Sequence, residues 1–227
     1  MKAQLAIYDM DRTVTRKATY TPFLIHAALM LAPWRLVLLP FVFLSMLAYV
    51  LKLLDRGRLK EINYGLLIGT RATPERLEPV IESFADKQVA TNIMPGARRS
   101  LAADRAAGRR LVMATASYRL YAAAIARRMG FDDVIATETS LDTKGRVVAR
   151  IDGRNCYGIA KKDMIEAWLQ KQGLEREAVH IRFYSDHISD RHVHNWADEP
   201  VAANAHRRLV RLAEAEGWEV LDWSDRK

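Results

Sequence analysis

Two acidic residues one position apart, Asp9 and Asp11, follow a short apolar run near the start of the chain. Neighbouring carboxylates repel each other, and the repulsion costs free energy unless a positive charge lies between them. A divalent cation would supply that charge, and an ionised carboxylate beside it can attack phosphorus as a nucleophile. The pair therefore indicates a metal site with phosphoryl-transfer chemistry. The alternative is a strand that ends in a polar turn.

Other groups suited to this chemistry follow later apolar segments. They are Thr115, Ser117, Lys161, Asp186 and Asp190. In open α/β sheets, ligands bind beyond the carboxyl ends of the strands, so we expect these side chains to gather with Asp9 and Asp11 at one edge. Hydroxyls and an ammonium group would hold the charge on the phosphoryl oxygens. A second carboxylate could protonate the leaving oxygen and later activate water.

The sequence motifs DMDRT, TAS, GIAK and SDHISD contain these residues. Their order and spacing resemble those of the haloacid dehalogenase superfamily, in the phosphoserine-phosphatase-like branch that carries a helical cap. The resemblance covers residues 5–14 and 110–204. The fourth motif departs from the commoner form that contains glycine, because Ser185 and His187 flank Asp186.

The resemblance implies a role for each motif residue. Asp9 resembles the nucleophile and Asp11 the general acid and base. Thr115 and Lys161 resemble the pair that holds the phosphate. The implied Mg²⁺ ligands are the Asp9 carboxylate, the Asp11 backbone carbonyl and Asp186, with Asp190 supporting the metal shell or the lysine.

Several residues have alternative interpretations. Ser117 is either a helix N-cap or a phosphate contact, and Lys162 could take the place of Lys161. A zinc site is a further alternative, because histidines lie near Asp190 at short spacings. Those histidines are His187, His192 and His194. Carboxylate-rich strand ends favour a hard cation instead. We interpret Cys156 as a packing residue.

Composition limits the class of protein and its partners. The 227 residues include 35 basic and 27 acidic ones, giving a formal charge of +8, and half are hydrophobic. This charge suits an anionic partner such as a phosphorylated substrate or an anionic membrane surface. We expect no nucleic acid, because no recognised binding motif accompanies the charge. One cysteine and the lack of a visible secretory signal indicate the cytoplasm or the cytoplasmic side of the inner membrane.

Strands alternate with helices from residue 95 to the end, which predicts an α/β fold with a mainly parallel, Rossmann-like sheet covered on both faces. Strands are expected over 4–8, 110–117, 133–137, 180–186, within 199–205 and over 218–223, and a hairpin over 140–153 turns at Lys144-Gly145. Helices are expected over 58–68, 74–90, 96–107, 118–129, 158–172 and up to Glu216. Residues 1–14 and 91–227 form the predicted core, and 15–90 form an inserted, all-helical cap.

The predicted cap contains an apolar tract over 23–54. Its second half, Leu36–Leu51, is uncharged and would form a helix about 24 Å long, short of the roughly 30 Å of a bilayer core. Pro33 and Pro40 interrupt helical hydrogen bonding. With its basic flanks, the tract resembles the cap of bacterial phosphatidylglycerophosphatases of the same superfamily and related hypothetical hydrolases. It would form either a membrane-associated hairpin or a buried core of the cap.

The motifs and the tract together predict a Mg²⁺-dependent phosphomonoester hydrolase that works through an aspartyl phosphate. The expected substrate is a membrane lipid phosphate such as phosphatidylglycerophosphate. The alternative is a small soluble phosphomonoester similar to phosphoserine. A third possibility is a non-enzymatic protein that binds a membrane, but such a protein has no need of four carboxylates at its strand ends.

Overall fold

The structure, a computed structural model, describes residues 2–224; positions 1 and 225–227 of the predicted core lie outside this range. The strands are β1 (Ala3–Tyr8), β2 (Arg71–Ala72), β3 (Arg110–Tyr118), β4 (Asp133–Leu141), β5 (Val147–Asp152), β6 (Val179–Ser185), β7 (Glu199–Ala203) and β8 (Glu219–Leu221). The helices are α1 (Tyr20–Leu31), α2 (Leu39–Val50), α3 (Arg56–Leu67), α4 (Pro74–Thr91), α5 (Pro95–Ala106), α6 (Arg119–Met129), α7 (Ile159–Lys171), α8 (Arg191–His194) and α9 (Arg207–Glu216). Shorter helical turns are η1 (Met10–Val14), η2 (Pro33–Leu38), η3 (Arg176–Ala178) and η4 (Ile188–Asp190).

These strands form one sheet in the order β2-β5-β4-β3-β1-β6-β7-β8. The six strands from β4 to β8 in this order run parallel, whereas β5 and β2 pair antiparallel at one edge. The predicted α/β fold with a mainly parallel sheet is confirmed. The first strand along the chain lies in the middle, between β3 and β6, so three carboxyl ends are neighbours there.

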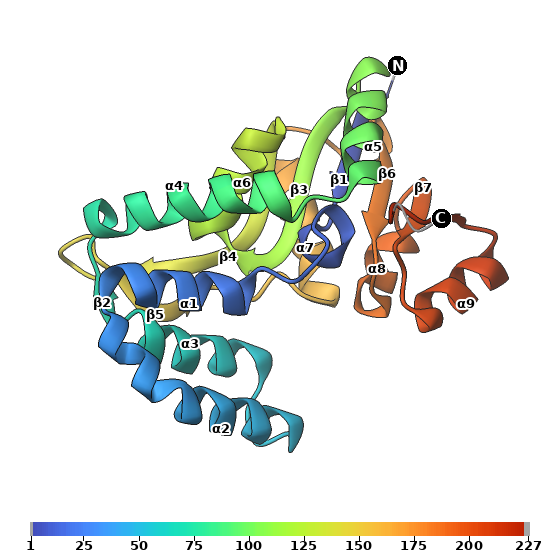
Figure 1. Ribbon diagram of the computed structural model, residues 1–227. Helices are drawn as coiled ribbons and strands as arrows, with labels where there is room; N and C mark the ends of the chain where they lie inside the picture. The colour runs from blue at the N-terminus through green and yellow to red at the C-terminus, as the bar shows by residue number, and fades with distance from the viewer. Residues whose placement is uncertain (1, 225–227) are drawn as a thin grey trace.

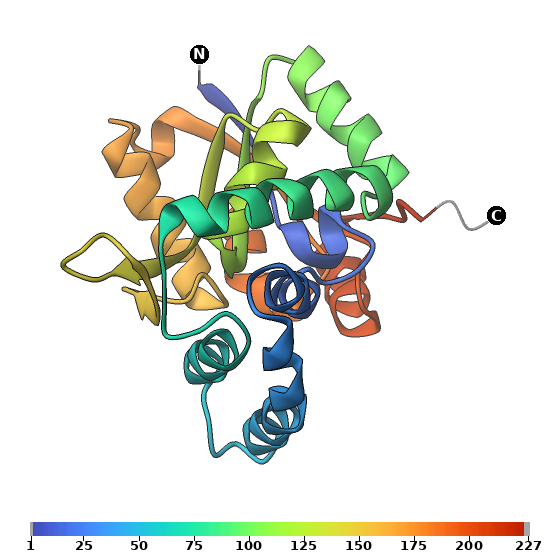
Figure 2. The same ribbon diagram turned by 60° about the vertical axis from the view of Figure 1, so that its left-hand side comes forward.

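Helices cover both faces of the sheet (Figures 1 and 2). Alternate residues of β1 show how the faces divide: Ala6 and Tyr8 belong to the apolar cluster that includes α1, α4, α5 and α6, whereas Leu5 and Ile7 pack with α7 and α8. This alternation follows from the two-residue period of a strand. An apolar run such as that of β1 is therefore buried on both sides, as expected for a central parallel strand.

The predicted hairpin forms between β4 and β5. Gly145 adopts a positive φ of 70° in the turn, and the Asp142 carboxylate accepts hydrogen bonds from the Lys144 and Arg146 amides at 2.9 and 3.0 Å. The segment expected as a separate short strand over 133–137 is continuous with the first arm of this hairpin, because β4 runs to Leu141. Its first half pairs with β3 and its second half with β5.

The insert between the first two motifs is helical apart from β2, which pairs with β5 at Arg71 and Ala72. An all-helical insert was expected from the sequence, and this two-residue strand is the exception. Helix α4 lies alongside α6 of the core (Figure 2). The division into a core and a cap at residues 15–90 stays a prediction, since α4 contacts both parts.

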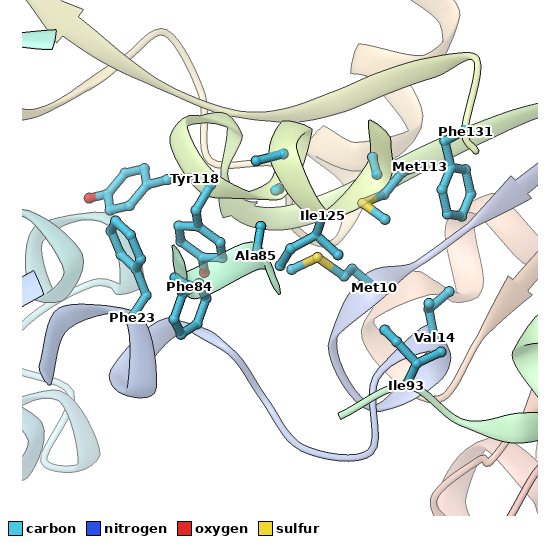
Figure 3. Packing of buried hydrophobic residues seen from close by; sticks show 14 of the residues in the cluster. Met10, Val14, Phe23, Phe84, Ala85, Ile93, Met113, Tyr118, Ile125 and Phe131 are labelled. Atoms are coloured by element: carbon cyan, nitrogen blue, oxygen red, sulfur yellow. The ribbon is translucent and has the colours of Figure 1, made fainter. Parts of the chain in front are cut away.

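The apolar tract 23–54 divides into a buried and an exposed half. In α1 the side chains of Phe23, Leu24 and Ala27 are fully buried in the large apolar cluster, which Figure 3 shows around Phe23 and Phe84. Helix α2 instead packs along α3, and its outer face is exposed. The two halves therefore lie in different surroundings: α1 forms part of the buried core, and α2 lies on the outside of the insert (Figure 1).

Aromatic residues pack behind the carboxyl end of β1. Tyr8 stacks on Tyr184 of β6, with ring centroids 4.2 Å apart, and Trp223 stacks on Tyr8. A Cβ atom at Gly96 in the first turn of α5 would overlap the Trp223 side chain. The same apolar cluster contains Met10 and Val14, the turn after β1 (Figure 3).

We therefore expect Gly96→Ala to lower the free energy of unfolding by about 1–3 kcal/mol, since overpacking displaces Trp223 from Tyr8. Chemical denaturation with tryptophan fluorescence measures this change. Gly65→Ala in α3 is the matched control, because its Cβ would meet only the Ala149 methyl group at 3.6 Å. The control should be neutral or stabilising by up to about 1 kcal/mol. Equal effects of the two substitutions would contradict the packing.

Candidate active site

The carboxyl ends of β1, β3 and β6 border one cavity of about 690 Å³. All of the candidate residues from the sequence line it: Asp9, Asp11, Thr115, Ser117, Lys161, Asp186 and Asp190. Strand pairing brings together residues more than 170 positions apart in the sequence, since Tyr8 of β1 pairs with Tyr184 of β6 and with Met113 of β3. The side chains gather where an open α/β sheet binds its ligands.

The tight turn η1 positions the first carboxylate. The backbone amide of Asp9 donates to the Tyr184 carbonyl at 2.9 Å, which fixes the end of β1 against β6. Arg12 then adopts a left-handed φ of 65°, and this reversal directs the Thr13 side chain back into the site. A positive φ costs free energy at a residue other than glycine and is found mainly where the surrounding structure imposes it.

Thr13 joins the first and fourth motifs. Its hydroxyl lies 3.3 Å from Asp9 Oδ2 and 3.4 Å from Asp186 Oδ1, and it accepts a hydrogen bond from the Asp186 amide at 3.0 Å. Both carboxylates are at least nine-tenths buried. The carboxylates of Asp9 and Asp186 are therefore close enough to contact one hydroxyl, as a shared cation would require.

Lys161 provides the buried positive charge. Its side chain is 2% exposed, and its ammonium group donates to Asp9 Oδ1 at 2.8 Å and to Asp190 Oδ2 at 2.6 Å. The Ser185 hydroxyl also donates to Asp190 Oδ2, at 2.7 Å. Lys162, the alternative, points elsewhere and pairs with Glu166 at 2.6 Å. The structure therefore places Lys161 in the cavity and uses Asp190 to hold it.

Burial and mutual repulsion raise the pKa values of two acids of this site. Burial raises the pKa of Asp9 to about 6, against the lowering effect of Lys161 and with the help of Asp190. Burial and the charges of Asp9 and Asp190 raise the pKa of Asp186 to about 8. Burial opposes the charge of Lys161, but Asp190 and Asp9 outweigh it and raise the pKa of Lys161. Three carboxylates around one ammonium thus leave an excess of negative charge.

A hard divalent cation fits this excess. Asp9 and Asp186 offer carboxylate oxygens around Thr13, and Asp190 Oδ1 is buried without a hydrogen-bond partner. These are the ligand types that Mg²⁺ prefers, with few protein carboxylates and room for water or phosphate oxygens. Across residues 2–224, no group of three His, Cys, Asp or Glu side chains is arranged to hold a metal ion, so a cation at Asp9 and Asp186 would take its remaining ligands from the backbone, water or phosphate.

Asp11 lies on the side of the cavity that faces the insert. Its Oδ1 accepts from the backbone amide and the hydroxyl of Thr19, both at 2.7 Å, and its Oδ2 accepts from Ser117 at 2.7 Å. Ser117 in turn accepts from the Tyr121 hydroxyl at 2.8 Å. The N-cap of α6 is Tyr118, so the N-cap interpretation of Ser117 is wrong. Ser117 instead orients Asp11.

Thr115 lies near the end of β3, fully buried, and its hydroxyl accepts from the Ser117 amide at 3.1 Å. The two hydroxyls of this segment are thereby fixed relative to each other. Of the histidine and cysteine candidates, His187 lines the cavity. His194 is buried between two backbone carbonyls, and burial raises the pKa of Cys156 to about 12, which suits a packing residue.

Lys60 of α3 is a site residue that the sequence did not single out as one. It lines the cavity with Asp11 and Ser117, and its ammonium donates to the Ala116 carbonyl and to Asn155 Oδ1 at 2.7 Å. Burial and the neighbouring charge of Arg56 lower the pKa of Lys60 to about 7. Lys60 lies in a basic segment of the sequence, and such segments are usually exposed to solvent. Only the folded structure shows that Lys60 is buried in the cavity.

Comparison with known proteins agrees with this geometry. A family profile described as haloacid dehalogenase-like hydrolase matches residues 6–193. The chain is 31% identical to Protein CicA of Caulobacter vibrioides over 67% of this chain and 66% of that protein. It is 28% identical to Phosphoserine phosphatase SerB1 of Mycobacterium tuberculosis over 63% of this chain and 45% of SerB1. It therefore spans about two thirds of the first relative and less than half of the second.

A solved structure resembles almost the whole chain. The crystal structure of a protein with unknown function from Bordetella pertussis Tohama I superposes with a TM-score of 0.89 at 26% identity. The match covers 98% of this chain and 100% of that one. The insert and the core together are therefore shared with that protein.

The raised pKa values predict a pH dependence of stability. In EDTA, folded Asp9 and Asp186 keep protons up to about pH 6 and 8, whereas an unfolded chain loses them near 3.8. Folding therefore takes up protons, and this contribution to stability is lost as pH rises from about 4 to 8. Between pH 5 and pH 8, the melting temperature of the wild type should fall relative to that of Asp186→Asn.

The comparison with Asp186→Asn isolates this contribution, because the half-buried His187 and the buried His194 have lowered pKa values and produce the opposite slope. Differential scanning calorimetry at several pH values in EDTA measures it. Parallel curves for the two proteins would contradict a protonated Asp186 in the metal-free site.

Proposed function

The chain belongs to the haloacid dehalogenase-like hydrolases, and from that premise we propose that it is a Mg²⁺-dependent phosphatase acting on a phosphomonoester of a membrane lipid. One observation carries the proposal. The cavity that holds Asp9, Asp11 and Lys161 is also lined by Met46, Tyr49 and Val50 of α2, the helix whose outer face is apolar and exposed. The acids and an apolar surface therefore border the same space.

Asp9 is the proposed nucleophile. A carboxylate oxygen of Asp9 bonds to phosphorus as the bond from phosphorus to the leaving oxygen breaks, and Asp11 gives that oxygen a proton. Asp11 then takes a proton from water as the water oxygen bonds to phosphorus, which releases inorganic phosphate and restores Asp9. The three hydrogen bonds that Asp11 accepts from Thr19 and Ser117 orient it for both transfers.

The positive groups of the site would hold the phosphoryl oxygens. Lys161 is already fixed beside Asp9 by Asp190 and needs no reorientation, which is the condition for effective electrostatic stabilisation. Thr115 supplies a hydroxyl at the end of β3. Asp9, Asp186 and the Asp11 carbonyl would hold Mg²⁺, with Asp190 behind Lys161, and the cation would neutralise charge that develops on the phosphate.

The outer face of α2 supports a lipid substrate. Its exposed apolar side chains include Phe41, Phe43, Leu44, Leu47 and Val50, and the exposed Val37, Leu51 and Leu53 lie next to its two ends. The helical segment Pro33–Val50 is, by length and composition alone, long and apolar enough to cross a membrane, and only 11% of it is buried. Contiguous exposed apolar surface of this kind marks interaction sites in folded proteins.

Basic residues lie at both ends of the exposed helix. Arg35 precedes α2, and Lys52 follows it. Basic residues next to an apolar helix attract the surface of an anionic membrane. We therefore propose that α2 lies in the membrane interface on the cytoplasmic side of the inner membrane, with the cavity opening toward the lipid head groups.

A small soluble phosphomonoester is the second candidate substrate. The observation that favours it is the 28% identity to Phosphoserine phosphatase SerB1. Both candidates share the chemistry at Asp9 and differ in what occupies the part of the cavity beside Met46 and Tyr49.

Removal of the nucleophile tests the chemistry. Asp9→Asn should lower kcat for a soluble phosphomonoester by at least about 10³-fold, because the amide cannot form the bond to phosphorus. Phosphate release with and without Mg²⁺ measures it. Asp163→Asn on the outer side of α7 is the control, since Asp163 forms an exposed ion pair with Arg154. Retention of Mg²⁺-dependent turnover by Asp9→Asn would contradict the assignment.

Substitutions in the exposed apolar face test whether the protein binds a membrane through it. Flotation with vesicles that contain phosphatidylglycerol should recover the wild type in the lipid fraction. The double variant Val37→Asp, Phe43→Asp should lose at least about tenfold in vesicle affinity, since burial of each apolar side chain contributes about 1.5–3 kcal/mol. Both side chains are more than 70% exposed, so the variant should keep the wild-type melting temperature.

Leu141 of β4 is the matched control, because it is 63% exposed but lies on the hairpin rather than on α2. Leu141→Asp should float as the wild type does. A wild type that stays with the soluble fraction, and hydrolyses soluble phosphomonoesters but no lipid phosphate in mixed micelles, would refute the lipid substrate and leave the second candidate.

A further inference from the structure

A buried ammonium group without a carboxylate partner lies in the cavity on the side of the insert. Lys60 is 5% exposed, and within residues 2–224 its hydrogen bonds go only to the neutral oxygens of Ala116 and Asn155. An uncompensated buried charge is costly and is normally paired. An ammonium group has three donors, and here two of them are used. The Tyr118 and Tyr20 rings lie 5.5 and 5.9 Å from the ammonium nitrogen, and Asp11 lines the same cavity, so the charge is compensated only in part and one donor remains for an anionic ligand.

A second cation lies one helical turn before Lys60. Arg56 also lines the cavity, and its guanidinium stacks over the Tyr157 ring at 4.1 Å. Residues four apart on a helix lie on the same face. The two cations of α3 thus point toward the same segment of the core, since Lys60 reaches Asn155 and Arg56 reaches Tyr157.

The position of the two cations relative to the phosphoryl site determines what they can bind. The transferred phosphoryl group would lie at Asp9, where Lys161 and Thr115 already supply its positive and hydroxyl contacts. Lys60 lines the cavity next to Asp11 and Ser117 instead, beside Met46 and Tyr49 of α2. Asp11 would protonate the leaving oxygen, so the cavity beyond it holds the leaving group.

We propose that Lys60, together with Arg56, binds a second anionic group carried by the leaving group of the substrate. This inference rests on the proposed phosphatase function and narrows its substrate class: the ester that is cleaved carries another negative charge near the phosphomonoester. A phosphodiester in a lipid head group or a carboxylate in a small soluble ester would both supply it. Phosphatidate, whose leaving group is an uncharged diacylglycerol, would not.

Matched pairs of substrates distinguish binding of a second anion by Lys60 from a general effect of Lys60 on turnover. Phosphatidylglycerophosphate and phosphatidate, in mixed micelles, differ by the additional phosphodiester. The soluble pair 3-phosphoglycerate and glycerol 3-phosphate differ by one carboxylate. The ratio of kcat/KM within each pair measures the preference for the second anion, and comparison of the two pairs shows whether a lipid or a small ester supplies it.

Lys60→Met should reduce that ratio by about 10- to 100-fold, since a hydrogen bond to a charged group contributes about 1.5–3 kcal/mol. The loss should appear mainly in KM. The fold should survive, because the Thr137 hydroxyl also donates to the Ala116 carbonyl at 2.8 Å. Arg56→Met is the second variant and should reduce the ratio in the same direction. Its effect should be smaller, because Arg56 is only half-buried.

Arg58→Met is the control, because Arg58 lies on the same helix but is exposed and paired with Glu61 at 3.1 Å. Its ratio should equal that of the wild type. A wild type without preference for the anionic member of either pair, or equal losses of Lys60→Met on both members, would overturn the inference while the phosphatase function stands. A wild type that hydrolyses none of the four substrates would overturn the proposed function and the inference with it.

Discussion

The ion pairs of Lys161 with Asp9 and Asp190 are the interaction on which the rest of the site depends. A fully buried ammonium is stable only when its desolvation is compensated, and here two carboxylates at 2.8 and 2.6 Å do so. Asp186 lies just beyond them, across the Thr13 hydroxyl. Three carboxylates therefore surround one ammonium group, which leaves two negative charges uncompensated when all of them are ionised. Burial, together with the repulsion between these carboxylates, raises the pKa values of Asp9 and Asp186, and a divalent cation would compensate their charge.

The order of the strands in the sheet brings these charged residues together. Because β1 lies between β3 and β6, three consecutive strand ends deliver Asp9, Thr115 and Asp186 to one place, and α7 brings Lys161 from the far side. The insert then completes the cavity with groups of two kinds. Helix α3 provides Lys60 and Arg56, which form no ion pair with an acid among residues 2–224, and α2 provides apolar side chains that continue onto an exposed surface. A substrate with both anionic and apolar parts matches that combination.

The sequence alone allowed prediction of the sheet and of the candidate residues, because short apolar runs that end in acids identify parallel strands and their carboxyl ends together. It could not show that Thr13 lies between two carboxylates, since that depends on the left-handed turn at Arg12. It also could not distinguish Lys60 from the exposed basic residues around it, because burial of a lysine depends on which face of α3 meets the core. The apolar tract was uniform in composition, yet α1 is buried and α2 is exposed, a difference that only tertiary packing determines.

A crystal structure of the protein with Mg²⁺ and beryllium trifluoride, a mimic of a phosphoryl group on a carboxylate, tests the central claim most directly. We expect the fluoroberyllate on the Asp9 carboxylate within hydrogen-bond distance of Lys161 Nζ, and one cation in contact with both Asp9 and Asp186. Fluoroberyllate bound away from Asp9, or a cation held without Asp186, would contradict the account.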